Sequence, residues 1–514
     1  MAAEGGTDGD FQAYHEPHVI EILILVSFFL FLALSDWLAD KIFRAGLIGQ
    51  IIVGLVYGVP LANILEINWR ETFLALGYVG LLLITFEGMF SIPANLLRSA
   101  KMCTGGLTIR LDLLRQNFIV SIIAALLGVL TPIALSFALL YAGFGHAFIV
   151  GTALCSTSLG TTFVVINSAS NDTDYSQTRI GTILISAAVL DDVCGLVLVS
   201  VIHQLRGIAE DGDVNLGWII GRPVLASGLL AILTPLVAIF VAGPLFRRFL
   251  EKPCQSSKNT SNILLMTVVL CAFLAIAAFA GASMLFGAFL AGAFLSSMPS
   301  REKTPSEPET TSFVTTFEYY LSGPQKFILQ PLFFASIGFA IPFGELWTGE
   351  VIWKGVVFTI LMVLSKLVVG LVVPAWDMFS AVGFPKPAPP AHERMRARKA
   401  ARASWAPATL LGTAMIARGE IGLLIIQIGL NETPFLTRKA FVVGVWAIVL
   451  NTIIGPVSVG VLLKKVGDQI ATDKTWGIQS KPRDMDVESA MAPEQPGQDG
   501  RLPEGKGEES IGGA

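Results

Sequence analysis

The chain has 514 residues, of which 53% are hydrophobic and only 14% are charged, and its formal net charge is -4. Soluble domains carry about 25% charged residues, so this composition excludes an ordinary soluble protein and predicts a polytopic membrane protein. The 50 glycines and 26 prolines fit that class, because membrane helices tolerate both residues where neighbouring helices satisfy the backbone. The five cysteines show no metal-binding or redox spacing. No resident cofactor and no nucleic-acid partner are expected.

Residues 1–18 are acidic and polar and lack the basic start of a secretory signal, so we expect an outer N-terminal tail followed by a retained helix. Apolar runs of about 17 to 25 residues then predict membrane-spanning helices. A shorter run from Leu285 to Ser297 makes a thirteenth span. The longer runs are 19–38, 45–65, 71–90, 118–141, 146–168, 179–203, 223–246, 262–283, 325–345, 351–375, 408–430 and 437–463.

Lysine and arginine in the short loops set the orientation of the spans. With the N-terminus outside or lumenal, the inner loops hold most basic residues, and the most basic loop, 386–402, falls inside only if all thirteen runs span. This orientation places the C-terminus in the cytoplasm. Residues 468–514 are rich in Gly, Pro and charged residues, a composition that predicts a disordered cytoplasmic tail.

Two adjacent acids, Asp191 and Asp192, lie in the middle of the apolar run 179–203. A carboxylate at membrane depth costs about 2.5 to 3.5 kcal/mol on the insertion scale, so such an acid indicates an ion or proton site. Adjacent positions on a helix point about 100° apart. The two carboxylates therefore cannot share one direction, and we expect one to meet a cationic partner while the other faces an aqueous cavity.

Hydroxyl residues interrupt the run 146–168, among them Thr157 and Ser158 in the stretch Gly151 to Thr162. Such a segment can leave the helical hydrogen-bond pattern, and its hydroxyls and freed carbonyls then offer oxygen ligands to a monovalent cation. The alternative is that small hydroxyl residues only pack a helix interface. The stretch Gly412 to Gly422 predicts a second interrupted helix, and paired interruptions in two halves of a chain indicate a transport site between inverted repeats.

Three further charges lie inside apolar runs. Lys366 has only Ser365 as a polar neighbour, so we expect it to pair with one of the two aspartates. Arg418 and Glu420 lie in the second interrupted stretch. Glu87 either forms an ion pair, for which Arg418 is one candidate, or reaches the interface.

Several motifs in order resemble the cation/proton antiporter superfamily, in the branch with paired aspartates. The segment Ser186 to Gly195 is similar to the family's Asp-Asp helix, and Ala153 to Ser158 is similar to its unwound helix. Further agreement comes from the segments Leu47–Gly58, Leu81–Glu87, Gly287–Gly292 and Phe333–Gly338. Gln50 departs from the pattern, because many relatives carry Glu there.

The resemblance implies an all-α polytopic membrane protein of about thirteen transmembrane helices, with inverted repeats and two crossed, broken helices. The antiporter domain would cover 19–467, with core helices at about 71–203 and 325–463 and scaffold helices at about 19–65 and 223–297. It also implies a homodimer. Asp192 would carry the cation or protons, Asp191 would pair with Lys366, and Thr157 with nearby carbonyls would complete the cation shell.

The predicted function is therefore exchange of a monovalent cation, Na⁺ or K⁺ and possibly Li⁺, for protons by alternating access within membrane lipid. A passive cation channel is one alternative, since it would also use oxygen-rich broken helices. An intramembrane aspartyl protease is another, but its two acids come from separate helices, which adjacent Asp191 and Asp192 do not. The chain is accordingly expected to be a transporter and not an enzyme.

Overall fold

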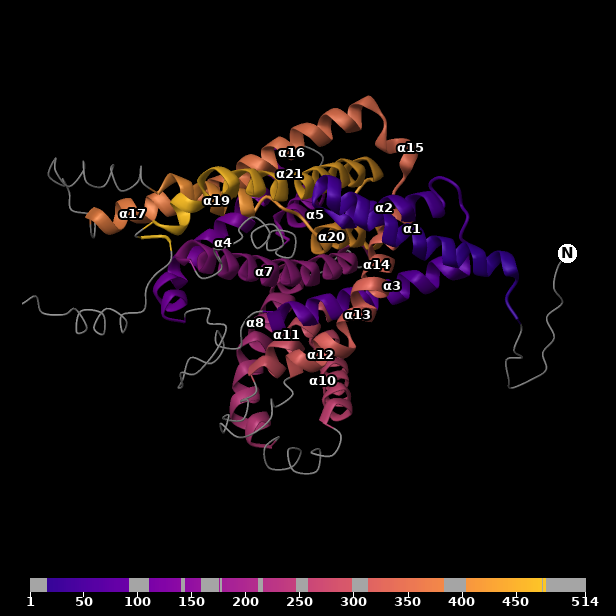
Figure 1. The fold of residues 1–514 in the computed structure, drawn as a ribbon, viewed down its shortest axis with the longest axis horizontal. Coiled ribbons are helices and arrows are strands. Elements are labelled where there is room, and N and C mark those ends of the chain that lie inside the picture. The colour runs from indigo at the N-terminus through magenta and orange to yellow at the C-terminus, as the bar shows by residue number, and fades with distance from the viewer. Residues whose placement is uncertain are drawn as a thin grey trace, which may run out of the picture. The chain divides into compact units, whose positions relative to one another are not determined.

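A computed structural model of the chain describes residues 16–91, 111–139, 144–158, 175, 178–210, 216–245, 258–297, 313–382, 404–473 and 475–477. These residues fold into helices (Figure 1). The helices of the first half are α1 (Val19–Phe43), α2 (Gly46–Tyr57), α3 (Ile67–Ser91), α4 (Leu111–Leu139), α5 (Phe144–Cys155), α7 (Arg179–Glu210), α8 (Leu216–Val237), the π-helix η3 (Ala238–Ala242), α10 (Lys258–Ala280) and α11 (Met284–Ser297).

The second half continues the helical pattern with shorter and more interrupted elements. Its helices are α12 (Phe313–Tyr320), α13 (Ser322–Pro324), the π-helix η5 (Gln325–Leu329), α14 (Gln330–Phe339), α15 (Phe343–Leu346), α16 (Gly349–Gly370), α17 (Val372–Val382), α19 (Trp405–Ala414), α20 (Glu420–Glu432) and α21 (Arg438–Ala471).

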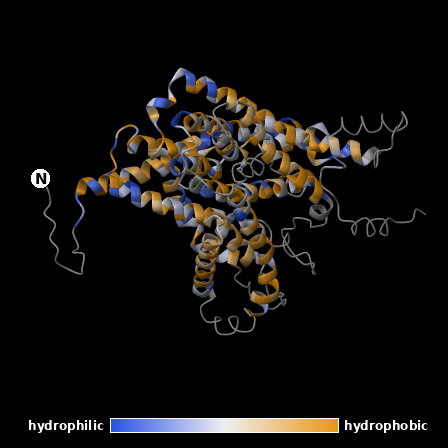
Figure 2. Ribbon diagram, turned by 180° about the vertical axis from the view of Figure 1, so that it is seen from behind, coloured by the Kyte–Doolittle hydropathy of each residue, from blue (hydrophilic) through white to orange (hydrophobic). Residues whose placement is uncertain are grey.

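Every apolar run that the sequence predicts overlaps one of these helices. Among the described residues, eight helices are long and apolar enough to cross a membrane, and α2, α5 and α11 are shorter apolar helices. Large apolar side chains on the outer faces of α1, α8 and α10 are exposed, for example Leu23, Leu225 and Phe279. Figure 2 shows hydrophobic residues along nearly all the described helices. Exposed apolar surfaces of this extent are typical of helices that face lipid. The exact count of thirteen spans stays a prediction.

Helix α2 packs between α1 and α14. The backbones of α2 and α14 approach so closely that a Cβ built on Gly54 would clash with the carbonyl oxygen of Ala335. A Cβ on Gly338 would likewise clash with the carbonyl oxygen of Ile51. Small residues allow such contact, which supplies much of the packing energy between helices in lipid.

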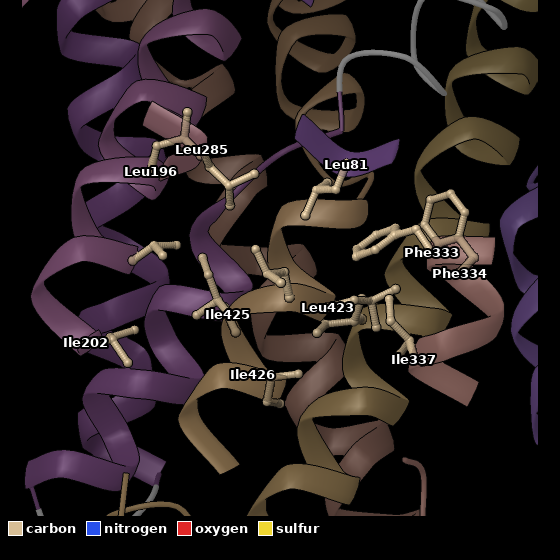
Figure 3. Packing of buried hydrophobic residues seen from close by; sticks show 14 of the residues in the cluster. Leu81, Leu196, Ile202, Leu285, Phe333, Phe334, Ile337, Leu423, Ile425 and Ile426 are labelled. Carbon is tan, nitrogen blue, oxygen red and sulfur yellow. The ribbon is translucent and has the colours of Figure 1, made fainter. Parts of the chain in front are cut away.

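A second group of helices carries the candidate site. Helix α4 packs against α5, α7 and α16, while α20 packs against α5, α7 and α21. Buried apolar side chains of α20, among them Leu423 and Ile425, belong to the same hydrophobic cluster as residues of α3, α7, α11 and α14 (Figure 3). The site therefore lies between elements whose positions are fixed by close packing.

The last helix extends beyond the predicted boundary at residue 468. Helix α21 continues to Ala471, and the next described residues, as far as Gly477, pack against the helices. The tail predicted for 468–514 therefore begins with an ordered segment. Residues 478–514, like the basic loop 386–402, lie outside the described residues.

Candidate functional site

The first break in a helix follows α5, which ends at Cys155. The next three residues, Ser156 to Ser158, are non-helical and buried. The hydroxyl residues that the sequence places farther along this stretch, Thr161 and Thr162, lie outside the described residues. The described part of the stretch shows that the helix ends where the interruption is predicted and that the next three residues are non-helical.

The second break separates α19, which ends at Ala414, from α20, which begins at Glu420. The two breaks meet directly, because the backbone N–H of Ser158 donates to the carbonyl oxygen of Ala417 at 2.9 Å. Gly419 lies against Ser158, where a Cβ would come within 2.7 Å of the serine Cβ. The interruptions predicted in the two halves of the chain are thus in contact.

Lys366, in the middle of α16, is fully buried and directs its ammonium at the first break. Its Nζ donates to the carbonyl oxygen of Cys155 at 2.7 Å, to Thr157 Oγ1 at 3.0 Å and to Asp191 Oδ2 at 3.2 Å. An ammonium has three donors, so these contacts use all of them. The predicted pairing of Lys366 with Asp191 is formed, and neither side chain is exposed.

Thr157 links the two members of this pair. Its hydroxyl donates to Asp191 Oδ2 at 2.5 Å while its oxygen accepts from Lys366. Helix α4 covers the same pair, because a Cβ built on Gly128 would lie 3.3 Å from Lys366 Nζ. Asp191 Oδ2 is therefore held by an ammonium and a hydroxyl, which offset the cost of burying the carboxylate, while Oδ1 is buried without a hydrogen-bond partner among the described residues.

Asp192 points elsewhere and has different surroundings. Its Oδ1 is buried and has no hydrogen-bond partner among the described residues, whereas the side chain as a whole is partly exposed. The charges that act on it are those of Asp191, Glu420 and Lys366. One helical turn farther along, Gly195 faces Ser156 and Ile421, so this side of α7 lies against the first break and the first turn of α20.

Arg418 lies within the second break and is fully buried. Its Nη1 donates to the carbonyl oxygens of Cys155 at 3.2 Å and Ser156 at 2.9 Å. Its own carbonyl oxygen accepts from the Thr452 hydroxyl at 3.0 Å. The guanidinium of one broken helix thus satisfies carbonyls freed by the other.

Two acids from the sequence analysis lie in different places. Glu420 is the first residue of α20 and is partly exposed. Its carboxylate is one of the charges that act on Asp192. Glu87 accepts a hydrogen bond of 2.5 Å from Gln325 Nε2, so the structure places it with η5 and not with Arg418. Among the described residues no carboxylate lies within ion-pair distance of Arg418.

The backbone oxygens of Cys155 and Ser156 could not be identified from the sequence as partners of particular side chains. The Cys155 oxygen accepts from both Lys366 and Arg418, and the Ser156 oxygen accepts from Arg418. Every residue has a backbone carbonyl, so residue types do not indicate which carbonyls accept hydrogen bonds from buried side chains. The available signal was the predicted break itself, because every interrupted helix exposes carbonyls that need donors.

Comparison with known proteins agrees with this geometry. A family model described as the transmembrane sodium/hydrogen exchanger matches residues 24–465, which is more than half of the chain. A Na⁺/H⁺ antiporter of Enterococcus hirae is 24% identical over 71% of this chain and 82% of that protein. The Na⁺/H⁺-K⁺ antiporter GerN of Bacillus cereus is 25% identical over 82% of this chain and 91% of that protein.

Among solved structures, the fold is similar to that of the sodium proton antiporter MjNhaP1 from Methanocaldococcus jannaschii. The TM-score is 0.50 at 14% identity, over 87% of this chain and 97% of that one. This likeness concerns the fold alone, and it confirms the fold class that the motifs predicted. The chain therefore belongs to the sodium/hydrogen exchanger family, a family of multi-pass membrane transporters and not of enzymes.

Proposed function

We propose that this protein exchanges a monovalent cation for protons by alternating access, with Asp192 as the residue that carries either ion. The observation that supports this most is the contrast between two adjacent acids. Asp191 is fully buried and engaged through Oδ2 by Lys366 and Thr157, whereas Asp192 is partly exposed and forms no ion pair or hydrogen bond with the described residues. The Oδ1 of each acid is buried without a hydrogen-bond partner among those residues. A buried carboxylate oxygen without a donor is costly, and a cation or a proton would satisfy it.

The exchange follows from competition at one carboxylate. When Asp192 is ionised and empty, moving it through a dry barrier is unfavourable, because the bare charge would lose its solvation. Binding a proton or a cation removes that charge and permits the movement. The protein would thus change sides only when loaded, so the two ions are coupled without a covalent step.

Oxygen ligands for the cation would come from the first break and from α20. Thr157 and Ser158 contribute hydroxyls and the interrupted chain contributes carbonyls, next to Asp192 and the carboxylate of Glu420. Sodium is the first candidate because the relatives described above are named Na⁺/H⁺ antiporters, and the name of GerN adds potassium. Lithium is a further candidate. We propose in addition a homodimer in membrane lipid, with the N-terminus outside and the C-terminus in the cytoplasm.

The test is reconstitution of the full-length protein into liposomes that contain a pH-sensitive dye. Addition of sodium, potassium or lithium should dissipate an imposed pH gradient in the wild type. Asp192→Asn should abolish the response while leaving the melting temperature close to that of the wild type. Glu350→Gln, at an exposed acid on α16, is the control and should transport normally.

The channel alternative gives a different result in the same vesicles. With the membrane potential clamped by an ionophore, a channel passes cations without proton counterflow, whereas an antiporter couples cation movement in one direction to proton movement in the other. If Lys366 released its proton when a cation enters, two protons would exchange for one cation. The rate would then depend on voltage, at about 2.3 kcal/mol per charge per 100 mV.

A further inference from the structure

The segment that follows α21 turns back onto the helices and buries a tryptophan. Asp473 Oδ1 accepts the backbone N–H groups of Thr475 and Trp476 at 2.8 and 2.9 Å, and Gly477 N donates to the Asp473 carbonyl at 2.9 Å. Trp476 is 0% exposed. A tight turn therefore presents one large aromatic side chain inward from the end of the last helix.

This turn caps the helix that carries the aspartate pair. The first backbone N–H groups of a helix have no partner within it. In α7, Arg179 N donates to the carbonyl oxygen of Gly477 at 3.2 Å, and Ile180 N donates to that of Trp476 at 3.1 Å. The Arg179 guanidinium also lies over the Trp476 ring, 4.5 Å from its centroid, which is a cation–π contact.

Side chains extend the same contact to other helices. Arg179 Nε donates to Asn117 Oδ1 of α4 at 2.7 Å. Trp476 Nε1 donates to Asp377 Oδ2 of α17 at 2.8 Å, and that oxygen also accepts from the hydroxyl of Ser404, which precedes α19. The turn thus joins α4 and α7 of the first half to α17, α19 and α21 of the second half.

We propose that the turn formed by Asp473 and Thr475–Gly477 is a clasp that positions α7 and so sets the height of Asp191 and Asp192 relative to the two broken helices. Helix α7 runs without interruption from Arg179 through the aspartates. At 1.5 Å per residue its first residue lies about 18 Å along the axis from Asp191. A helix transmits an axial shift along its length, so a displacement of the first turn of α7 would also displace the two aspartates. Because Trp476 holds that first turn, it is a positioning residue. The transport part of this inference rests on the proposed role of Asp192.

The experiment compares full-length Trp476→Ala, Trp476→Phe and wild type in nanodiscs and liposomes. Hydrogen–deuterium exchange at the first turn of α7 should become about five- to tenfold faster in Trp476→Ala, the size expected for lost capping. The apparent KM for the cation should change severalfold. Trp476→Phe keeps the ring over Arg179 but loses the N–H donated to Asp377, so it should be intermediate. Trp218→Ala, at an exposed tryptophan of α8, is the matched control and should change neither quantity.

Unchanged exchange protection at the first turn of α7 in both variants would overturn the clasp. Faster exchange with an unaltered KM and an unaltered pH profile of transport would show a contact that only stabilises the fold, and would also overturn the positioning role. If Trp476→Ala does not fold, Trp476→Phe provides the same two readouts. The exchange measurement does not depend on transport, so a failure of the Asp192 assignment remains distinguishable from a failure of the clasp.

Discussion

The hydroxyl of Thr157 donates to Asp191 Oδ2 at 2.5 Å, across 34 positions of the sequence. The Thr157 hydroxyl oxygen also accepts a hydrogen bond from Lys366 Nζ. One small side chain of the first break therefore links the acid of α7 to the ammonium of α16. Donor, acceptor and ammonium are all buried. The break that follows α5 is therefore held in place partly by Asp191, which is not the acid proposed to carry the ions.

Thr157→Val should destabilise the protein by about 1 to 3 kcal/mol, because it keeps the shape of threonine but leaves Asp191 and Lys366 each without one buried hydrogen bond. Thermal melting in detergent, followed by tryptophan fluorescence, measures the effect. Thr157→Ser retains the hydroxyl and is the matched control. Equal melting temperatures of the valine and serine variants would contradict this role.

Lys366→Ala should be more damaging, by about 3 to 5 kcal/mol, because it leaves Asp191 as an uncompensated buried charge. The double variant Asp191→Asn with Lys366→Ala removes both charges and should recover part of that loss. A double-mutant cycle of melting temperatures isolates the coupling between the two residues. Additive effects of the two single changes would argue against the ion pair as the source of stability.

Gly422→Ala tests the close contact of α20 with the end of α5. The added Cβ would lie 2.6 Å from the carbonyl oxygen of Ala153, so the helices must separate at a cost of about 1 to 3 kcal/mol. Gly195→Ala is the control, since its Cβ would lie at an ordinary 3.6 Å from Ser156. Exchange rates in proteoliposomes should fall for the first variant and stay near wild type for the second. Equal rates would contradict the requirement for contact.

Glu420→Gln should raise the apparent KM for the cation by about threefold to tenfold, or about 0.7 to 1.4 kcal/mol. The reason is that Glu420 adds negative charge next to Asp192, and this charge attracts a cation. The KM is measured from the initial rate of dye response against cation concentration. A KM equal to that of the Glu350→Gln control would remove Glu420 from the site.

Much of the fold could be predicted from sequence because membrane spans depend on local composition. The apolar runs predicted the helices, and the glycines around 412–422 predicted the second break. Both patterns can be recognised within about 20 consecutive residues. The separation of Asp191 from Asp192 also followed from helix geometry. The pairing of Lys366 with Asp191 could be proposed because a buried ammonium has few possible partners.

Other contacts could not be predicted because they join distant parts of the chain through groups with no distinctive pattern. Trp476 lies in a segment whose composition resembles that of a solvated tail, and only the packing of α7 and α17 shows that it is buried. Likewise, the contact of Glu87 with Gln325 depends on how α3 meets η5. Composition describes a segment, whereas burial depends on what the rest of the fold places beside it.

The carbonyl oxygen of Cys155 has a consequence for mutational scanning. It is the shortest contact of Lys366 and is shared with Arg418, yet it belongs to the main chain. Replacing the cysteine with alanine or serine changes the thiol and leaves that oxygen in place. A scan would therefore report only the loss of the buried thiol and its contact with the Thr152 carbonyl oxygen. A substitution that redirects the backbone, such as Cys155→Pro, would test the main-chain oxygen on which two buried cations depend.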